Sequence, residues 1–280
     1  MTIPFIKAHG AGNDFLFTFS RDLPGEIGVK QFPGIAQAIC HRHTGVGADG
    51  WYLIDRIVAG GAHASVRLWN SDGSKAELSG NGTRCACAIL VEQGLAPEEV
   101  HIATGSGIKI ATLQRRDAQG LWFEMEMGVP VVAAGNLRVE LPLSTGPRDA
   151  TIVDVGNPQC SVPVENFDFD WKAAGGEIEN HARFAPAKTN VSFFQKVSDR
   201  SIDVRFWERG AHHTLSSGTG SVGAAVTAML RGIVESPVTV QTEFCPMVVR
   251  WDKPTEPVFL TGPARVIARG EFAYATQPQP

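Results

Sequence analysis

The chain repeats part of its own sequence after half its length. The segment 66–70, VRLWN, returns at 204–208 as VRFWE, and the segment 79–82, SGNG, returns at 217–220 as SGTG. Both pairs are separated by the same 138 residues, from 66 to 204 and from 79 to 217. A constant offset over separated stretches is typical of two structurally similar halves. The repeat therefore predicts a pseudo-twofold molecule in which two Ser-Gly-x-Gly turns present equivalent groups to one cleft.

The length of the chain agrees with two domains. At 280 residues it exceeds the size at which a single core grows comfortably, and each half has an ordinary domain length. We expect an N-terminal domain over residues 1–130, joined by a C-terminal strand at 264–276, and a C-terminal domain over 131–263. The segment 129–150 contains several Gly and Pro residues without clear periodicity, which predicts the crossing between the halves. The final TQPQP is expected to be frayed.

Composition excludes several classes of protein. A hydrophobic fraction of 43% with 19% charged residues is typical of soluble globular proteins, and a net charge of −4 gives no electrostatic reason to expect a nucleic-acid partner. No apolar run approaches the roughly 20 residues that span a bilayer, and the first residues lack a secretory signal pattern. We expect a cytoplasmic protein without a membrane partner.

The cysteine pattern indicates neither a disulfide framework nor a zinc site. The five cysteines are odd in number and form no C-x-x-C pair. No metal site is expected, and the cysteines are predicted to be reduced, mostly buried thiols: Cys40, Cys85, Cys87, Cys160 and Cys245. Cys85 and Cys87 are expected to lie in a core helix.

Short β-branched or alternating runs predict a fold dominated by strands. These runs are 66–69, 108–113, 121–127, 202–207 and 238–242. Helices are predicted at 35–41, 83–93 and 221–231, and the last two follow the Ser-Gly-x-Gly turns and stop at a glycine. Because these two helices are apolar nearly all round, each must be enclosed on most sides. We therefore predict an α/β (α+β) fold of two pseudo-symmetric domains, each a curved, mainly antiparallel sheet wrapped around a central helix.

Each glycine turn predicts a site for an anion. The first N–H groups of a helix have no partner in the helix, and they are aimed at whatever lies in front of it. Glycines at 80, 82, 218 and 220 would let a ligand approach the backbone closely. The alternative is that Ser79 and Ser217 are only N-caps, a role that serine fills often. Two such serines in one register favour the site.

Six sequence blocks, in order and spacing, resemble the diaminopimelate epimerases. They are HGAGNDF at 9–15, GVGAD at 45–49, NSDGSKAELSGNG at 70–82, GNP at 156–158, TNV at 189–191, and ERG at 208–210 through SGTG at 217–220. The resemblance runs from Lys7 to about Gly270. It implies an isomerase of lysine and peptidoglycan biosynthesis, with two pseudo-symmetric α/β domains, a substrate between them, a homodimer and no pyridoxal phosphate or other cofactor.

The two turns depart from that family at the reacting group. There, each turn carries a cysteine, and one thiolate removes the α-proton while the opposite thiol returns a proton to the other face. Here both positions are serine, Ser79 and Ser217, and a hydroxyl is a far weaker acid that needs a neighbouring base. Three further departures surround the cleft that the resemblance implies. The family's N-P-H is N-P-Gln159, its G-A-G-E-T is G-A-H-H-T at 210–214, and its glutamine after the aspartate of GVGAD is Gly50.

Four side chains beside the turns are candidates to activate a serine. His212 and His213 are the replacement bases to test first, because imidazole titrates near neutral pH. The alternative is a pair of solvated loop histidines. Glu208 and Asp72 flank the turns and could orient or activate a serine, unless they are exposed turn carboxylates.

The resemblance also implies residues that hold the two amino-acid ends of a diaminopimelate-like substrate. Amide side chains both donate and accept, and a Glu-Arg pair can meet an ammonium and a carboxylate together. The matching positions are Asn13, Asn70, Gly80, Asn81, Asn157, Asn190, Glu208, Arg209, Gly218 and Thr219.

Three functions follow, in order of preference. The first is an epimerase that interconverts L,L- and meso-diaminopimelate by cofactor-independent removal and return of the α-proton. The second is a lyase or tautomerase, because proton removal from one side needs only one strong base. The third is a catalytically silent homologue that binds an amino acid.

Overall fold

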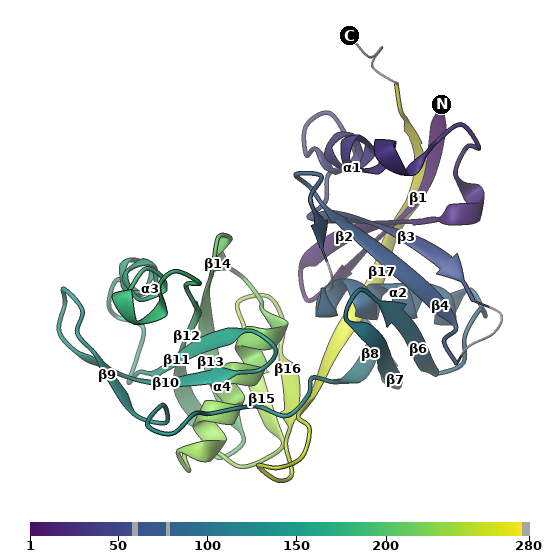
Figure 1. Cartoon of the computed structure of the whole chain (residues 1–280). Coiled ribbons are helices and arrows are strands. Elements are labelled where there is room, and N and C mark those ends of the chain that lie inside the picture. The colour runs from purple at the N-terminus through teal and green to yellow at the C-terminus, as the bar shows by residue number, and fades with distance from the viewer. Residues whose placement is uncertain (58–60, 77–78, 276–280) are drawn as a thin grey trace. The chain divides into compact units, whose positions relative to one another are not determined.

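The structure, a computed structural model, describes residues 1–57, 61–76 and 79–275 of the chain (Figure 1). The predicted frayed tail, 276–280, lies outside the described residues. The chain divides into two compact units: unit 1 comprises Met1–Glu124 and Pro263–Pro280, and unit 2 comprises Met125–Gly262. Within the described residues, no helix is long and apolar enough to cross a membrane.

Unit 1 contains a sheet and two α-helices. Its strands are β1 (Thr2–Gly10), β2 (Asn13–Phe19), β3 (Gly50–Arg56), β4 (Ala64–Asn70), β5 (Lys75–Ala76), β6 (Glu99–Thr104), β7 (Gly107–Asp117), most of β8 (Gly120–Glu126) and most of β17 (Phe259–Ala273). The helices are α1 (Phe32–Cys40) and α2 (Gly80–Glu92), with short 3-10 turns at Ser20–Asp22 and Val29–Gln31.

Unit 2 repeats this plan. Its strands are β9 (Val139–Leu141), β10 (Arg148–Asp154), β11 (Pro158–Pro163), β12 (Asn190–Ser198), β13 (Ser201–Glu208), β14 (His212–Thr214), β15 (Val238–Gln241) and β16 (Met247–Arg250). The helices are α3 (Trp171–Glu179) and α4 (Gly218–Leu230), and Ala182–Phe184 forms a 3-10 turn.

The sequence repeat is also a repeat of strand pairing. The pairs β1–β2 and β10–β11 are both antiparallel, and β2–β3 and β11–β12 are both parallel. The same agreement holds for the antiparallel pairs β3–β4 and β12–β13 and for the parallel pairs β4–β6 and β13–β15. The central helices α2 and α4 begin and end 138 residues apart. The two-domain, mainly antiparallel architecture predicted from the repeat is confirmed.

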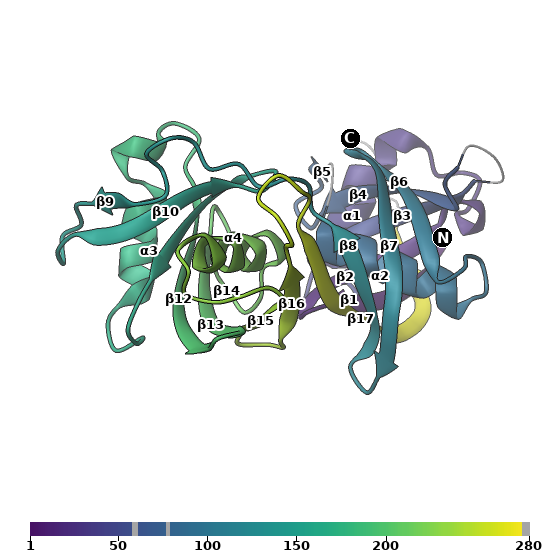
Figure 2. The same ribbon diagram turned by 90° about the horizontal axis from the view of Figure 1, so that it is seen from below.

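The predicted helices are present and enclosed as expected. The helices predicted at 83–93 and 221–231 are α2 and α4, which begin three residues earlier because the turn glycines belong to their first turns. Every residue of α4 from Gly220 to Ala228 is buried, and strands β10 to β13, β15 and β16 contact it (Figure 2). In unit 1, α2 contacts β1, β2 and β6, while α1 contacts β3 and β4. Each unit therefore wraps its sheet around one apolar helix.

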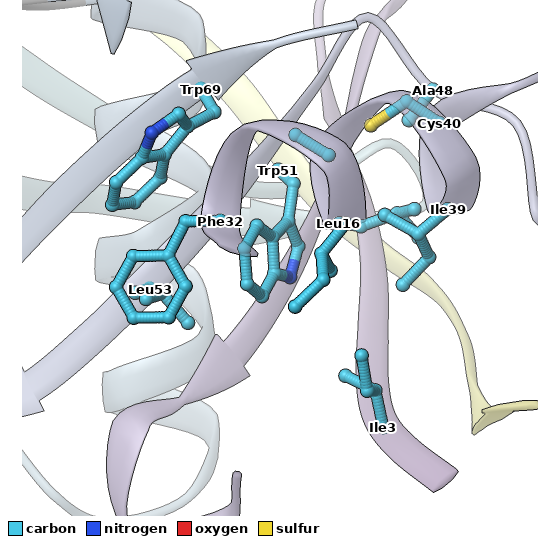
Figure 3. Packing of buried hydrophobic residues seen from close by; sticks show 11 residues of the cluster. Ile3, Leu16, Phe32, Ile39, Cys40, Ala48, Trp51, Leu53 and Trp69 are labelled. Carbon is cyan, nitrogen blue, oxygen red and sulfur yellow. The ribbon is translucent and has the colours of Figure 1, made fainter. Parts of the chain in front are cut away.

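Aromatic packing fixes α1 on the sheet of unit 1 (Figure 3). The ring of Phe32 meets the rings of Trp51 and Trp69 edge-on, at 5.9 and 5.1 Å between centroids. The Trp51 indole N–H donates to Thr18 Oγ1 at 3.0 Å, so its polar atom is satisfied in the core. Since side chains alternate along a strand, Tyr52 points to the other face, where its hydroxyl reaches the start of α2.

The prediction that segment 129–150 is only a crossing was wrong. The chain passes between the units at Glu124 and Met125, and the segment contains β9 and the start of β10. Val139, Leu141 and Ala150 are buried in the core of unit 2. Prolines and glycines between three-residue runs conceal the alternation that would have indicated these strands.

Candidate active site

Ser217 is the N-cap of α4 and is bonded on both sides. Its Oγ accepts a hydrogen bond from the Gly220 N–H at 3.2 Å and donates one to Glu208 Oε2 at 2.8 Å. The residue is 4% exposed. The other Glu208 oxygen, Oε1, accepts from Thr214 Oγ1 at 2.6 Å. Two hydroxyls thus hold the carboxylate, and the Ser217 proton lies on the line to a group that can take it.

Ser79 occupies the equivalent place in unit 1 without such a partner. Its Oγ accepts from the Gly82 N–H at 3.2 Å, which is the same N-cap bond. Its carbonyl oxygen accepts from Thr83 Oγ1 at 2.9 Å and from the Tyr52 hydroxyl at 3.4 Å. In the described part of the chain, no carboxylate or imidazole is hydrogen-bonded to Ser79 Oγ.

Asp72, a candidate to orient or activate a serine, closes its own turn, as the alternative of a turn carboxylate predicts. Its Oδ1 accepts from the Ser74 N–H at 2.8 Å and from Ser74 Oγ at 2.5 Å. These two bonds hold the pKa of the exposed Asp72 carboxyl below its ordinary value. The Asp72 carbonyl accepts from Gln37 Nε2 at 2.7 Å, which ties the turn to α1.

His212 and His213 are turned toward other groups. His212 lies flat on Trp207, with 5.0 Å between ring centroids and 17° between planes. His213 Nε2 lies 2.7 Å from Glu243 Oε2, and its ring meets Trp171 edge-on at 5.1 Å. Among the described residues neither imidazole is bonded to Ser217, because Glu208 takes that place. Within the described residues, neither imidazole is hydrogen-bonded to Ser79 or Ser217, so no contact supports the predicted role of either histidine as a base.

Two predicted substrate-binding residues of unit 2, Asn190 and Arg209, are hydrogen-bonded to each other. Asn190 Oδ1 accepts from the Arg209 N–H at 3.0 Å, and Asn190 Nδ2 donates to the Pro158 carbonyl at 3.1 Å. Arg209 Nη1 donates to the Ala187 carbonyl at 2.7 Å. The turn at 208–210 is therefore held to the segment before β12.

Two amides are held at the start of α4. Asn157 Nδ2 donates to Thr219 Oγ1 at 3.3 Å. Gln159, which is buried, donates from Nε2 to Asn157 Oδ1 at 2.8 Å and to Thr219 Oγ1 at 3.2 Å. The family's histidine position thus carries an amide that bonds to two predicted ligand-binding residues.

In unit 1 the predicted amides are held less uniformly. Asn70 Nδ2 donates to Ser74 Oγ at 2.9 Å, and Asn81 Oδ1 accepts from the buried Arg84 guanidinium. Asn13 Nδ2 donates to the carboxylate of Asp49. That donation leaves the Asn13 carbonyl oxygen as the atom with which it could meet an ammonium.

A charged network around Asn13 was missed by the sequence reasoning. Arg42 Nη2 lies 2.7 Å from Asp49 Oδ1 and 2.8 Å from Asp14 Oδ1, and Lys7 Nζ lies 3.0 Å from Asp14 Oδ2. Burial alone would raise the pKa of Asp14, but hydrogen bonds from Arg42 and Lys7 outweigh it and the pKa lies below 3.8. Asp14 lies in the block HGAGNDF and Asp49 in the block GVGAD, so the blocks themselves pointed to both aspartates.

The turn glycines have different reasons to be glycine. A Cβ at Gly82 would lie 2.3 Å from the Tyr52 hydroxyl oxygen, and one at Gly220 would lie 2.8 Å from Phe206 Cδ1. Both positions are therefore required for packing inside their own units. Gly80 has nothing within 4 Å of a built Cβ, so packing does not require glycine at this position.

Comparison with known proteins identifies the family. The sequence pattern of diaminopimelate epimerase matches residues 5–133 and 151–267. The chain belongs to the diaminopimelate epimerase family. It is 34% identical to the diaminopimelate epimerase of Pelotomaculum thermopropionicum over 97% of this chain and 99% of that protein. It is 36% identical to the diaminopimelate epimerase of a Synechococcus strain over 97% and 98%.

Solved structures from other families share the fold. A probable proline racemase from Agrobacterium radiobacter superposes with a TM-score of 0.72 at 17% identity, covering 99% of this chain and 94% of that one. A PhzF-family phenazine biosynthesis protein from Bacillus anthracis gives 0.71 at 16%, covering 97% and 99%. At these identities the likeness establishes the architecture of this member of the diaminopimelate epimerase family and nothing about its substrate.

Proposed function

We propose that this chain is an amino-acid epimerase that interconverts L,L- and meso-diaminopimelate without a cofactor, with Ser217 and Glu208 acting together as the base. The observation that carries the proposal is the 2.8 Å hydrogen bond from Ser217 Oγ to Glu208 Oε2. A serine that already donates to a carboxylate has a group to receive its proton. The family resemblance extends the proposal to a homodimer in the cytoplasm.

In the proposed step, the substrate Cα–H bond breaks and its proton bonds to Ser217 Oγ. The former hydroxyl proton of Ser217 moves to Glu208 Oε2, so the negative charge is left on the substrate. The first N–H groups of α4, at Gly218 and Thr219, supply partial positive charge to the α-carboxylate of the substrate. Ser79 Oγ–H then gives a proton to the other face. Exchange with water restores the Ser79 hydroxyl and the Glu208 carboxylate.

The remaining predicted ligand-binding residues would hold the two amino-acid ends. In unit 2, Arg209 offers its guanidinium to a carboxylate, and Asn157 and Asn190 offer amides. In unit 1, Asn13, Asn70 and Asn81 offer amides, and Gly80 offers its backbone.

A second candidate is an isomerase or lyase that uses one base. The asymmetry of the turns supports it, because within the described residues Ser217 Oγ donates to a carboxylate and Ser79 Oγ does not. Removal of a proton from one face, followed by double-bond migration or elimination, needs no acid at Ser79. Such an enzyme would not produce a stereoisomer.

Incubation of the protein with L,L-diaminopimelate in deuterated water separates these functions. Epimerisation gives deuterium at the α-carbon together with the meso isomer, measured by mass spectrometry and chiral chromatography. An unsaturated or keto product without a stereoisomer selects the second candidate. Calorimetry that shows tight binding of diaminopimelate, without deuterium exchange or product, overturns both enzymatic functions. The remaining function is then that of a protein that binds an amino acid.

A matched pair of variants tests the role of Glu208. Glu208→Gln keeps an acceptor for one hydroxyl but removes the base, and we expect exchange to fall by about 100-fold. Thr214→Val removes only the other hydroxyl bond to the same carboxylate and should retain most of the activity. Equal losses in both variants would show that Glu208 is needed only for structure.

A further inference from the structure

Glu179 is a buried carboxylate that no predicted role accounts for. It is the last residue of α3, and its side chain is 3% exposed. A carboxylate in such a place is costly unless it is paired and fully hydrogen-bonded. The identity of its donors therefore shows what it holds in place.

Two donors from different segments meet at this carboxylate. Trp207 Nε1 donates to Oε2 at 2.9 Å, and Lys188 Nζ lies 3.1 Å from Oε1. The backbone N–H of Gly210 also favours the charged form of this group. Burial by itself would raise the pKa of Glu179, but these bonds outweigh burial and the pKa lies below 4.5. The group is thus an anion held by its surroundings.

The two donors lie in the two segments that hold Glu208 and Arg209. Trp207 is the residue immediately before this pair, so the carboxylate is tied to the start of the turn. Lys188 lies in the segment whose Ala187 carbonyl and Asn190 side chain bind Arg209. Glu179 therefore fixes both the turn and the segment against which Arg209 is held.

Packing of α3 on β13 supports the same arrangement. A Cβ at Gly175 would lie 2.8 Å from Trp207 Cβ and Cγ, so glycine at this point of α3 allows the indole to lie against the helix. The imidazole of His212 also stacks on the Trp207 ring, with 5.0 Å between the ring centroids. The Trp207 N–H is thereby directed to Glu179 rather than to solvent.

We propose that Glu179 is a positioning residue that sets the orientation of Arg209 and hence the affinity for the substrate carboxylate. This inference rests on the proposed function for its ligand, since Arg209 is the group proposed to bind it. The Ser217–Glu208 bond has its own support in Thr214. Loss of Glu179 should consequently weaken substrate binding more than it slows the chemical step.

The test compares Glu179→Gln with Glu177→Gln in the full-length protein. The amide of Glu179→Gln can accept from one donor but presents an N–H to the other. Glu177 is the matched control, since it is also on α3 and holds a different segment, accepting from the Ser144 N–H at 2.7 Å and from Ser144 Oγ at 2.8 Å. We expect about a tenfold or larger rise in KM for Glu179→Gln, with kcat changed less than about threefold. Glu177→Gln should leave both constants near those of the unmodified protein.

Amide hydrogen exchange gives a readout that does not require turnover. We expect residues 208–212 to exchange faster in Glu179→Gln than in Glu177→Gln, with equal rates in α4. If the unmodified protein proves inactive on diaminopimelate, this selective change upholds the role of Glu179 while the proposed function fails. Unchanged exchange at 208–212 overturns the inference, and so does a loss confined to kcat.

Discussion

The two Ser-Gly-x-Gly turns have the same backbone and different chemical surroundings. Both serines cap a 13-residue helix and accept an N–H three residues on, at 3.2 Å in each unit. They differ in the residue at the end of the preceding long strand. Asn70 and Glu208 are equivalent positions of the repeat, 138 residues apart, so unit 1 has an amide where unit 2 has a carboxylate. The same helix start can therefore be built with different side chains around it.

The largest expected effect comes from restoring both thiols. The double variant Ser79→Cys/Ser217→Cys should raise α-deuteration and epimerisation of L,L-diaminopimelate by about 100-fold or more, because a thiolate at a helix N-terminus is a far better base than a hydroxyl. Chiral chromatography of the products in deuterated water measures it. The single variants are the controls, and equal rates in all four proteins would refute the proposed cleft chemistry.

A smaller effect should distinguish Asn70 from Glu208. We expect Asn70→Ala to reduce kcat by less than about tenfold, against about 100-fold for Glu208→Gln, because an amide can hold a substrate but cannot accept the serine proton. Steady-state kinetics at saturating substrate makes the comparison. A loss at Asn70 as large as that at Glu208 would mean that the two sides are catalytically equivalent after all.

The charged network of unit 1 should make stability depend on pH. Because the pKa of Asp14 is lowered in the folded protein, the Asp14 carboxylate stabilises the fold fully above pH 3.8. This contribution is lost as the pH falls through the lower pKa of the folded state. Asp14→Asn should cost about 1–3 kcal/mol at pH 7, with a difference that shrinks below pH 3.8. Urea unfolding at several pH values measures it.

The control for this experiment is Asp22→Asn, since Asp22 forms only an exposed pair with Arg21 at 3.5 Å. Its effect should be below about 1 kcal/mol at every pH. An equal effect from the two variants would show that the Asp14 network contributes no more than a surface ion pair.

The smallest effect concerns thiol reactivity. All five native cysteines are buried, and burial raises the pKa of Cys40, Cys85 and Cys160 to about 12. The folded protein should therefore not react with a disulfide reagent at pH 8, whereas Ser79→Cys should gain one reactive thiol. Absorbance after reagent addition counts the thiols. Reaction of the unmodified protein at the same rate would contradict the burial of its cysteines.

The sequence predicted the repeat, the enclosed helices and the turns because these depend on local spacing. It did not predict α3, because paired glycines at 175 and 176 are unusual inside a helix and Gly175 is explained only by the indole of Trp207 lying against it. It also favoured His212 and His213 as the bases that activate a turn serine. The antiparallel pairing of β13 with β14 sets Glu208 opposite His212, and both imidazoles turn to other groups. Proximity along the chain cannot give that register.

The strand β17 has a consequence for synthesis of the protein. Residues 265–273 pair with 2–9 of β1, so the first strand of unit 1 takes its neighbour from the far end of the chain. Unit 2 is a single continuous stretch, Met125–Gly262. On the ribosome, unit 2 can therefore finish folding while β1 still has an open edge, and unit 1 closes only when the final strand emerges. The half that begins the chain is the last to be completed.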